Sequence, residues 1–292
     1  MKLKQTPPLV GGVFVCPLSR LRERVGERAS SLATSFSASP HTLSPDPSPA
    51  SGRGEANKGL RYNPPMNLPE LPPNPAGFPT EAAAFTLTGP AGALECIGDV
   101  AERADARRGV AVVCHPNPVQ GGTMHNKVVT MVERALRESG LDTLRFNFRG
   151  TGASEGTYDD GNGESEDLAA VVAWLRRVRP ADALWLAGFS FGSYVTIRNA
   201  VRLKADALVS IAPPVGRWTM DDALPACPWL VVMGEADEVV EPQAVFDWIA
   251  GMEQPPELIR MPETGHFFHR RLMDLRGAVK HAIADWLPPA RG

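Results

Sequence analysis

Short apolar runs recur from about residue 82 onward, and their spacing alternates between that of strands and that of helices. Two alternating stretches, 84–87 and 94–97, flank a Gly-Pro-Ala-Gly turn and predict a β-hairpin. Further runs predict strands at 109–114, 141–148, 183–187, 207–212, 229–233 and 258–261. Helical spacing predicts helices at 126–139, 164–178, 191–203, 242–251 and 271–286. This alternation predicts an α/β fold, a mostly parallel sheet with helices on both faces.

The N-terminal part of the chain differs in composition. Residues 1–65 are rich in Pro, Ser, Gly and Arg and have no apolar period, so we expect a disordered, functionally silent tail. This tail has three interpretations: a signal peptide, an organellar transit sequence, or translated intergenic repeats upstream of a true start at Met66. The apolar stretch is short and arginines stand where a cleavage site belongs, which argues against a signal peptide. We favour translated intergenic repeats, because residues 17–28 and 43–55 look like such repeats. A Pro-rich lead-in, 66–79, precedes the expected domain, 80–292.

Charge and composition exclude several classes of protein. Of the 30 Lys and Arg and 33 Asp and Glu, nine and four lie in residues 1–65, which leaves 21 against 29 in an acidic body without a nucleic-acid footprint. No apolar run is long enough to span a membrane. The four cysteines have neither zinc-site nor disulfide spacing, which favours a reduced, cytoplasmic protein. The oligomeric state stays open.

One pentapeptide carries the candidate nucleophile. The sequence Gly188-Phe-Ser-Phe-Gly192 lies between a predicted strand and a predicted helix, as a nucleophile elbow does. The glycines leave room for a tight turn, and the helix amino end favours developing negative charge at Ser190. The alternative is an ordinary turn.

A serine hydroxyl needs a base, and the base needs an acid that orients it. In the order expected downstream of such an elbow, Asp237 follows one predicted strand and His266 follows the next. We favour Asp237 over Glu235, which lies so near its strand that it should form the turn, and Glu238 is the fallback. The alternative base is His269.

Two backbone N–H groups should bind the oxyanion. One is that of Phe191, which follows the serine. The other should come from the loop after strand 109–114, where Pro116 and Pro118 have no N–H and leave Asn117 as the donor. His115 in this loop is expected to brace it rather than to bind a metal ion, since no set of metal ligands accompanies it.

No cofactor is expected. Glycines at 150, 152 and 156 imitate a dinucleotide fingerprint, but their spacing is off by one and the next helix starts late. The chain contains no phosphate-binding loop of the Walker type. We therefore expect this stretch to form a loop near the active site.

These motifs together resemble the α/β-hydrolase superfamily, in particular a bacterial group of predicted hydrolases similar to dienelactone-hydrolase-like esterases. The resemblance spans roughly residues 80–287. It rests on 115–118, 121–124, 144–156, 188–192, 227–230, Asp237 and 266–269. Relatives more often have His-Pro-His-Pro where this chain has Asn117, a change that leaves the backbone donor in place but puts any side-chain role in doubt.

The resemblance implies a serine hydrolase for small-molecule esters, with a thioesterase, an amidase or a non-catalytic binding protein as alternatives. A peptidase would need a deeper subsite or an extra domain. The 16 residues from 213 to 228 are too few for a helical lid. We expect a small, apolar and open pocket formed by Phe189, Trp218, Met220, Phe267 and Phe268.

A chain that starts at Met66 should be as active and as thermally stable as the full chain, because the preceding tail has no core-forming pattern. Thermal unfolding and ester hydrolysis of both forms check this expectation. A clearly lower melting temperature of the short form would mean that the tail packs.

Overall fold

The structure, a computed structural model, describes residues 73–220 and 224–292. The predictions for the tail and for most of the lead-in lie outside these residues. The strands are β1 (Ala83–Gly89), β2 (Gly92–Asp99), β3 (Gly109–Cys114), β4 (Asp142–Phe146), β5 (Ala183–Phe189), β6 (Ala207–Ile211), β7 (Trp229–Gly234) and β8 (Glu257–Met261). The helices are α1 (Lys127–Glu138), α2 (Asn162–Val178), α3 (Phe191–Ala200), α4 (Pro242–Ala250) and α5 (Leu272–Ala282), with 3₁₀ turns η1 (Pro118–Gln120) and η2 (Ala284–Trp286).

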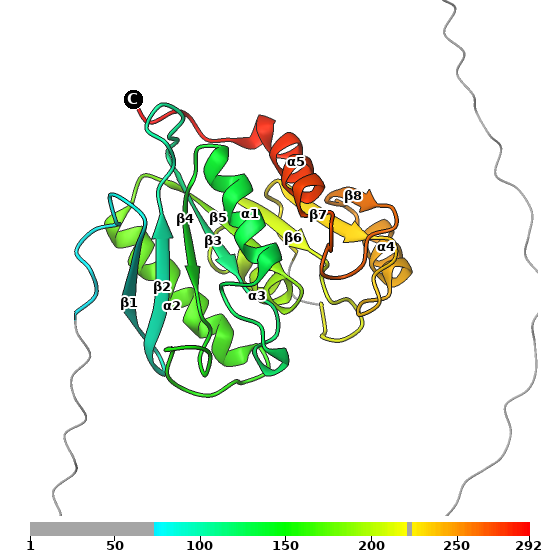
Figure 1. Ribbon diagram of the computed structural model, residues 1–292, viewed down its shortest axis with the longest axis horizontal. Coiled ribbons are helices and arrows are strands. Elements are labelled where there is room, and N and C mark those ends of the chain that lie inside the picture. The colour runs from blue at the N-terminus through cyan, green and yellow to red at the C-terminus, as the bar shows by residue number, and fades with distance from the viewer. Residues whose placement is uncertain (1–72, 221–223) are drawn as a thin grey trace, which may run out of the picture. The chain divides into compact units, whose positions relative to one another are not determined.

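The predicted α/β fold is confirmed. The strands form one sheet in the order β1-β2-β4-β3-β5-β6-β7-β8, in which β2 pairs antiparallel with both β1 and β4 and all other neighbours pair in parallel. After β3 the chain first places β4 on one side and then β5 on the other, so right-handed crossovers put α1 and α2 on opposite faces. Helix α5 packs on α1, and α3 packs on α2 (Figure 1). Ligands bind at the carboxyl ends of strands beside such a reversal.

Several element ends differ from the predictions, and α3, for example, ends at Ala200 rather than at residue 203. Strand β4 ends at Phe146, because Phe148 turns out of the sheet and donates its N–H to the His115 ring. Strand β5 continues to Phe189, so Ser190 follows the strand directly. The last predicted helix divides into α5 and η2. Periodicity does not register such ends, which depend on side-chain hydrogen bonds.

Helix α2 covers the antiparallel edge of the sheet. Its Trp174 is buried and packs on Phe85 of β1, with ring centroids 5.2 Å apart. The indole N–H of Trp174 donates to the carbonyl of Pro75 at 2.9 Å. The described part of the lead-in is therefore packed against the domain.

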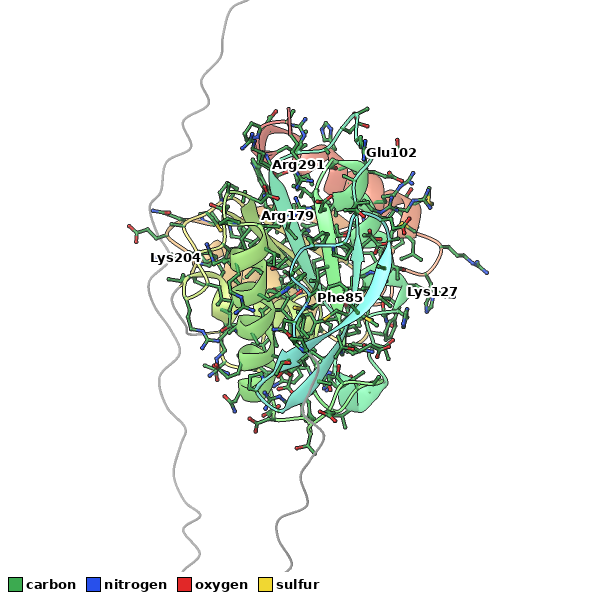
Figure 2. The ribbon with its side chains drawn as sticks, turned by 90° about the vertical axis from the view of Figure 1, so that its left-hand side faces the viewer. Phe85, Glu102, Lys127, Arg179, Lys204 and Arg291 are labelled. Carbon is green, nitrogen blue, oxygen red and sulfur yellow. The ribbon has the colours of Figure 1, made fainter. Side chains whose placement is uncertain are left out.

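An ion-pair cluster lies at the amino end of β4. Asp142, buried at the start of β4, accepts hydrogen bonds from Arg179 and Arg291, each at 2.8 Å. Both arginines lie near one another in Figure 2, and Arg291 ties the C-terminal residues to this end. The helices of the described residues include none that is long and apolar enough to cross a membrane. Between β6 and β7, residues 212–220 and 224–228 form no helix.

Candidate active site

The candidate nucleophile occupies a strained junction. Ser190 lies between the last residue of β5 and the first residue of α3, with φ 52° and ψ −118°. Non-glycine residues seldom adopt such a conformation, and it persists only where the surroundings enforce it. The neighbours enforce it here: a Cβ at Gly188 would collide with the backbone of Gly192, and one at Gly192 would collide with the carbonyl of Cys114. Because Gly188 and Gly192 have no side chain, strand β5, helix α3 and the end of β3 can approach one another closely.

Ser190, His266 and Asp237 form one hydrogen-bonded line. The His266 Nε2 atom lies 3.1 Å from Ser190 Oγ, and its Nδ1 atom lies 2.8 Å from Asp237 Oδ2. Because a carboxylate only accepts, Nδ1 carries the proton and donates to Asp237, which leaves Nε2 as the acceptor for the serine hydroxyl. All three residues are at most 9% exposed. This arrangement can take a proton from the serine and return it.

Backbone groups hold the acid in place. Asp237 Oδ1 accepts the N–H groups of Val239 and Val240, both at 2.8 Å, so Oδ2 alone faces His266. Glu235 forms the turn after β7, where its N–H donates to the carbonyl of Met261, as the sequence predicts. Glu238 has a different role from the one considered for it, because its carboxylate accepts the backbone N–H of His266 at 3.1 Å.

The two predicted oxyanion donors are free. Among the described residues, no acceptor is hydrogen-bonded to the backbone N–H of Asn117 or of Phe191. The Asn117 carbonyl accepts the N–H groups of Gln120 and Gly122, and its side chain accepts that of Val119 at 2.9 Å. The Asn117 side chain therefore caps the 3₁₀ turn η1 and fixes the loop. This is a structural role for the asparagine that replaces the histidine more common in relatives.

His115 connects this loop to the one after β4. Its Nδ1–H donates to the carbonyl of Pro116 at 2.7 Å, and its Nε2 accepts the N–H of Phe148 at 3.0 Å. The ring is fully buried, and this burial lowers its pKa to about 4. The imidazole is therefore neutral near pH 7. In the described part of the chain, no group of three or more His, Cys, Asp or Glu side chains is placed to hold a metal ion.

A cavity of about 150 Å³ opens at Ser190 and His266. Its other lining residues are Pro116, Asn117, Gln120, Gly121, Gly122, Asn126, Val239 and Phe267. Sequence analysis missed Gln120, Asn126 and Val239. For Val239, its position two residues after Asp237 could have indicated that it lines the cavity.

The prediction of an aromatic pocket is largely wrong. Phe267 is 41% exposed and lines the cavity, but Phe189 and Phe268 are fully buried in the core. Phe189 packs beneath the His266 ring at 5.0 Å between centroids, because the pleat of β5 points it inward. Trp218 packs on Phe191, and Met220 is buried; neither lines this cavity.

Comparisons with known proteins agree with this geometry. Residues 104–226 match the family of X-Pro dipeptidyl-peptidases (S15 family). The uncharacterized protein RP471 of Rickettsia prowazekii is 31% identical over 204 residues, which cover 66% of this chain and 85% of that protein. The structure of XC6422 from Xanthomonas campestris, described as an α/β serine hydrolase without lid, is 55% identical with a TM-score of 0.72. It is matched over its whole length by 75% of this chain.

A second solved structure gives the same result. An α/β serine hydrolase homologue from Coxiella burnetii is 41% identical and has a TM-score of 0.68. The match covers 71% of this chain and 100% of that one.

The pH dependence of stability tests the environment of His115. The folded protein binds a proton there at about pH 4 and the unfolded chain at about pH 6.5, so the free energy of unfolding falls as the pH drops through this window. His115→Asn removes this contribution. Between pH 7 and pH 5, the free energy of unfolding measured with urea should fall by about 2 kcal/mol less for the variant than for the wild type. The exposed His281→Asn is the control, and equal losses for His115→Asn and the wild type would contradict the assignment.

Proposed function

The chain belongs to the α/β-hydrolase superfamily, and on this premise we propose that it is a serine hydrolase that cleaves small carboxylic esters through an acyl-enzyme. One observation carries the proposal. The hydrogen-bonded line from Asp237 through His266 to Ser190 ends on a serine that a strained strand-to-helix junction holds beside two free backbone N–H groups. A structural role would need neither the strain nor the free donors.

The proposed mechanism follows from this arrangement. His266 Nε2 accepts the hydroxyl proton while Ser190 Oγ attacks the ester carbonyl, and Asp237 stabilises the imidazolium that forms. The backbone N–H groups of Asn117 and Phe191 bind the oxyanion. His266 then protonates the leaving alcohol. A water molecule, deprotonated by the same imidazole, releases the acid from the serine.

The cavity supports a small neutral ester over a dipeptide substrate. An enzyme that removes amino-terminal dipeptides has to bind a free ammonium group, which calls for a carboxylate near the site. Among the described residues that line the cavity, His266 is the one with an ionisable side chain. The family match to S15 peptidases also ends at residue 226, before Asp237 and His266. We therefore favour an esterase.

Thioesters and amides remain alternatives, because the same groups can attack all three carbonyls. The leaving groups distinguish them. An amine needs protonation before it leaves, whereas an alkoxide or thiolate needs it less, so butyrate esters, thioesters and anilides with comparable leaving groups should be cleaved at different rates. A preference for the thioester at equal chemical reactivity would move the proposal to a thioesterase.

The cytoplasmic location belongs to the same proposal. It rests on the cysteines, of which Cys96, Cys114 and Cys227 are free in the described part of the chain. Burial raises the pKa of the Cys96 thiol to about 12, so this side chain is an unreactive core residue.

Ser190→Ala should lower kcat by about 10³-fold or more, since removal of the nucleophile from a triad has this effect. The variant should fold like the wild type, because glycines on both sides and not the hydroxyl allow the turn. Hydrolysis of 4-nitrophenyl butyrate and labelling by a fluorophosphonate probe measure the effect. Labelling of the wild type but not of the variant also excludes a non-catalytic binding protein. Full activity of the variant would contradict the mechanism.

The rate should depend on acyl length in a way that reflects the cavity. Each methylene that becomes buried adds about 0.8 kcal/mol, so kcat/KM should rise from acetyl to butyryl 4-nitrophenyl esters. It should fall beyond hexanoyl, because a cavity of about 150 Å³ cannot enclose more. A rate that keeps rising to palmitoyl, with activation at a lipid interface, would contradict the substrate class.

A further inference from the structure

The cavity at Ser190 has two chemically different sides. Val239 and Phe267 come from the loops that carry Asp237 and His266, and both are apolar. The other side comes from the loop after β3 and the start of α1, and its lining residues include the exposed Gln120 and the half-buried Asn126, both with amide side chains. The aromatic residues near the candidate site in the sequence predicted an apolar pocket and not this difference between its two sides.

The two amides keep hydrogen-bonding capacity for a ligand. The Oδ1 atom of Asn126 accepts the N–H of Val128 at 2.8 Å as the N-cap of α1, which fixes the orientation of the amide. Its Nδ2 group donates to no acceptor in the described part of the protein, and the side-chain amide of Gln120 makes no hydrogen bond there either. An alkyl chain packed against these groups would remove them from water without a replacement partner.

The chemistry of the reaction assigns each side to one part of the substrate. The leaving alcohol must lie beside His266 Nε2, which protonates it, and therefore on the side of Val239 and Phe267. The acyl chain then extends the other way, along the loop that supplies the Asn117 N–H, toward Gln120 and Asn126.

We propose that Gln120 and Asn126 form an acyl subsite for a short chain that bears an uncharged hydrogen-bond acceptor, such as an ether or carbonyl oxygen. This inference rests on the proposed esterase function and names its substrate class. The acceptor must be neutral, because neither Lys nor Arg is among the described residues that line the cavity and could pair with a carboxylate.

Three benzyl esters of similar acyl size test the subsite in the full chain: benzyl pentanoate, benzyl 3-methoxypropanoate and monobenzyl succinate. The methoxy ester replaces one methylene by an ether oxygen. After division by each ester's hydroxide rate constant, its kcat/KM should exceed that of the pentanoate by about three- to tenfold, the effect of one hydrogen bond between neutral groups. The charged succinate should be the poorest substrate.

Three variants connect the preference to the two amides. Gln120→Leu and Asn126→Ser, which keeps an oxygen for the helix cap, should bring the ratio of methoxy ester to pentanoate close to one. Val239→Ala, on the alcohol side, is the matched control and should keep the wild-type ratio. Gln120→Lys should raise kcat/KM for monobenzyl succinate at least tenfold, a gain that misfolding cannot produce.

The outcomes separate the subsite from the function. Cleavage of the pentanoate as fast as the methoxy ester, or an unchanged ratio in both Gln120→Leu and Asn126→Ser, would overturn the subsite and leave the esterase intact. No cleavage of any ester together with no fluorophosphonate labelling of Ser190 would overturn the function, and the subsite with it.

Discussion

The site depends on the close approach of three backbone segments at Ser190. The carbonyl of Cys114, at the end of β3, lies where a side chain at Gly192 would have to be, and Gly188 contacts Gly192 in the same way. This contact holds Ser190 at a positive φ and places the loop after β3 beside the first turn of α3. One packing constraint thereby positions both the proposed nucleophile and the proposed oxyanion loop. Any larger residue at either glycine would separate them.

The sheet supplies the remaining components at the same edge. Strand order reverses at β3, and β5, β7 and β8 run parallel, so the loops after these strands meet above one end of the sheet. Backbone N–H groups then fix the side chains: those of Val239 and Val240 orient Asp237, and that of His266 donates to Glu238. The buried, neutral His115 joins the loop after β3 to the one after β4. Preorganisation of this kind is what lets an active site stabilise charge without rearrangement.

The substrate has to fit a site that offers little charge. Among the described residues that line the cavity, the proposed base is the one ionisable side chain, so the proposed recognition of the substrate depends on size, apolar contact and neutral hydrogen bonds. No helix is present in the described residues between β6 and β7, and Val239 and Phe267 at the cavity are both exposed. The small and largely uncharged lining of the cavity supports the proposed small neutral substrate.

The sequence by itself determined the strand and helix alternation and the identity of Ser190, Asp237 and His266 as candidates, because these follow from local spacing and from the order of residues after strands. Tertiary structure decided where neighbouring side chains point. Phe189 and Phe268 adjoin candidate residues in the chain, yet the strand pleat and a φ of 51° at Phe268 place both in the core. Gln120 and Asn126 line the same cavity as His266, although each lies about 140 residues before it in the chain. Such contacts join loops that are distant in the chain, so no local pattern encodes them.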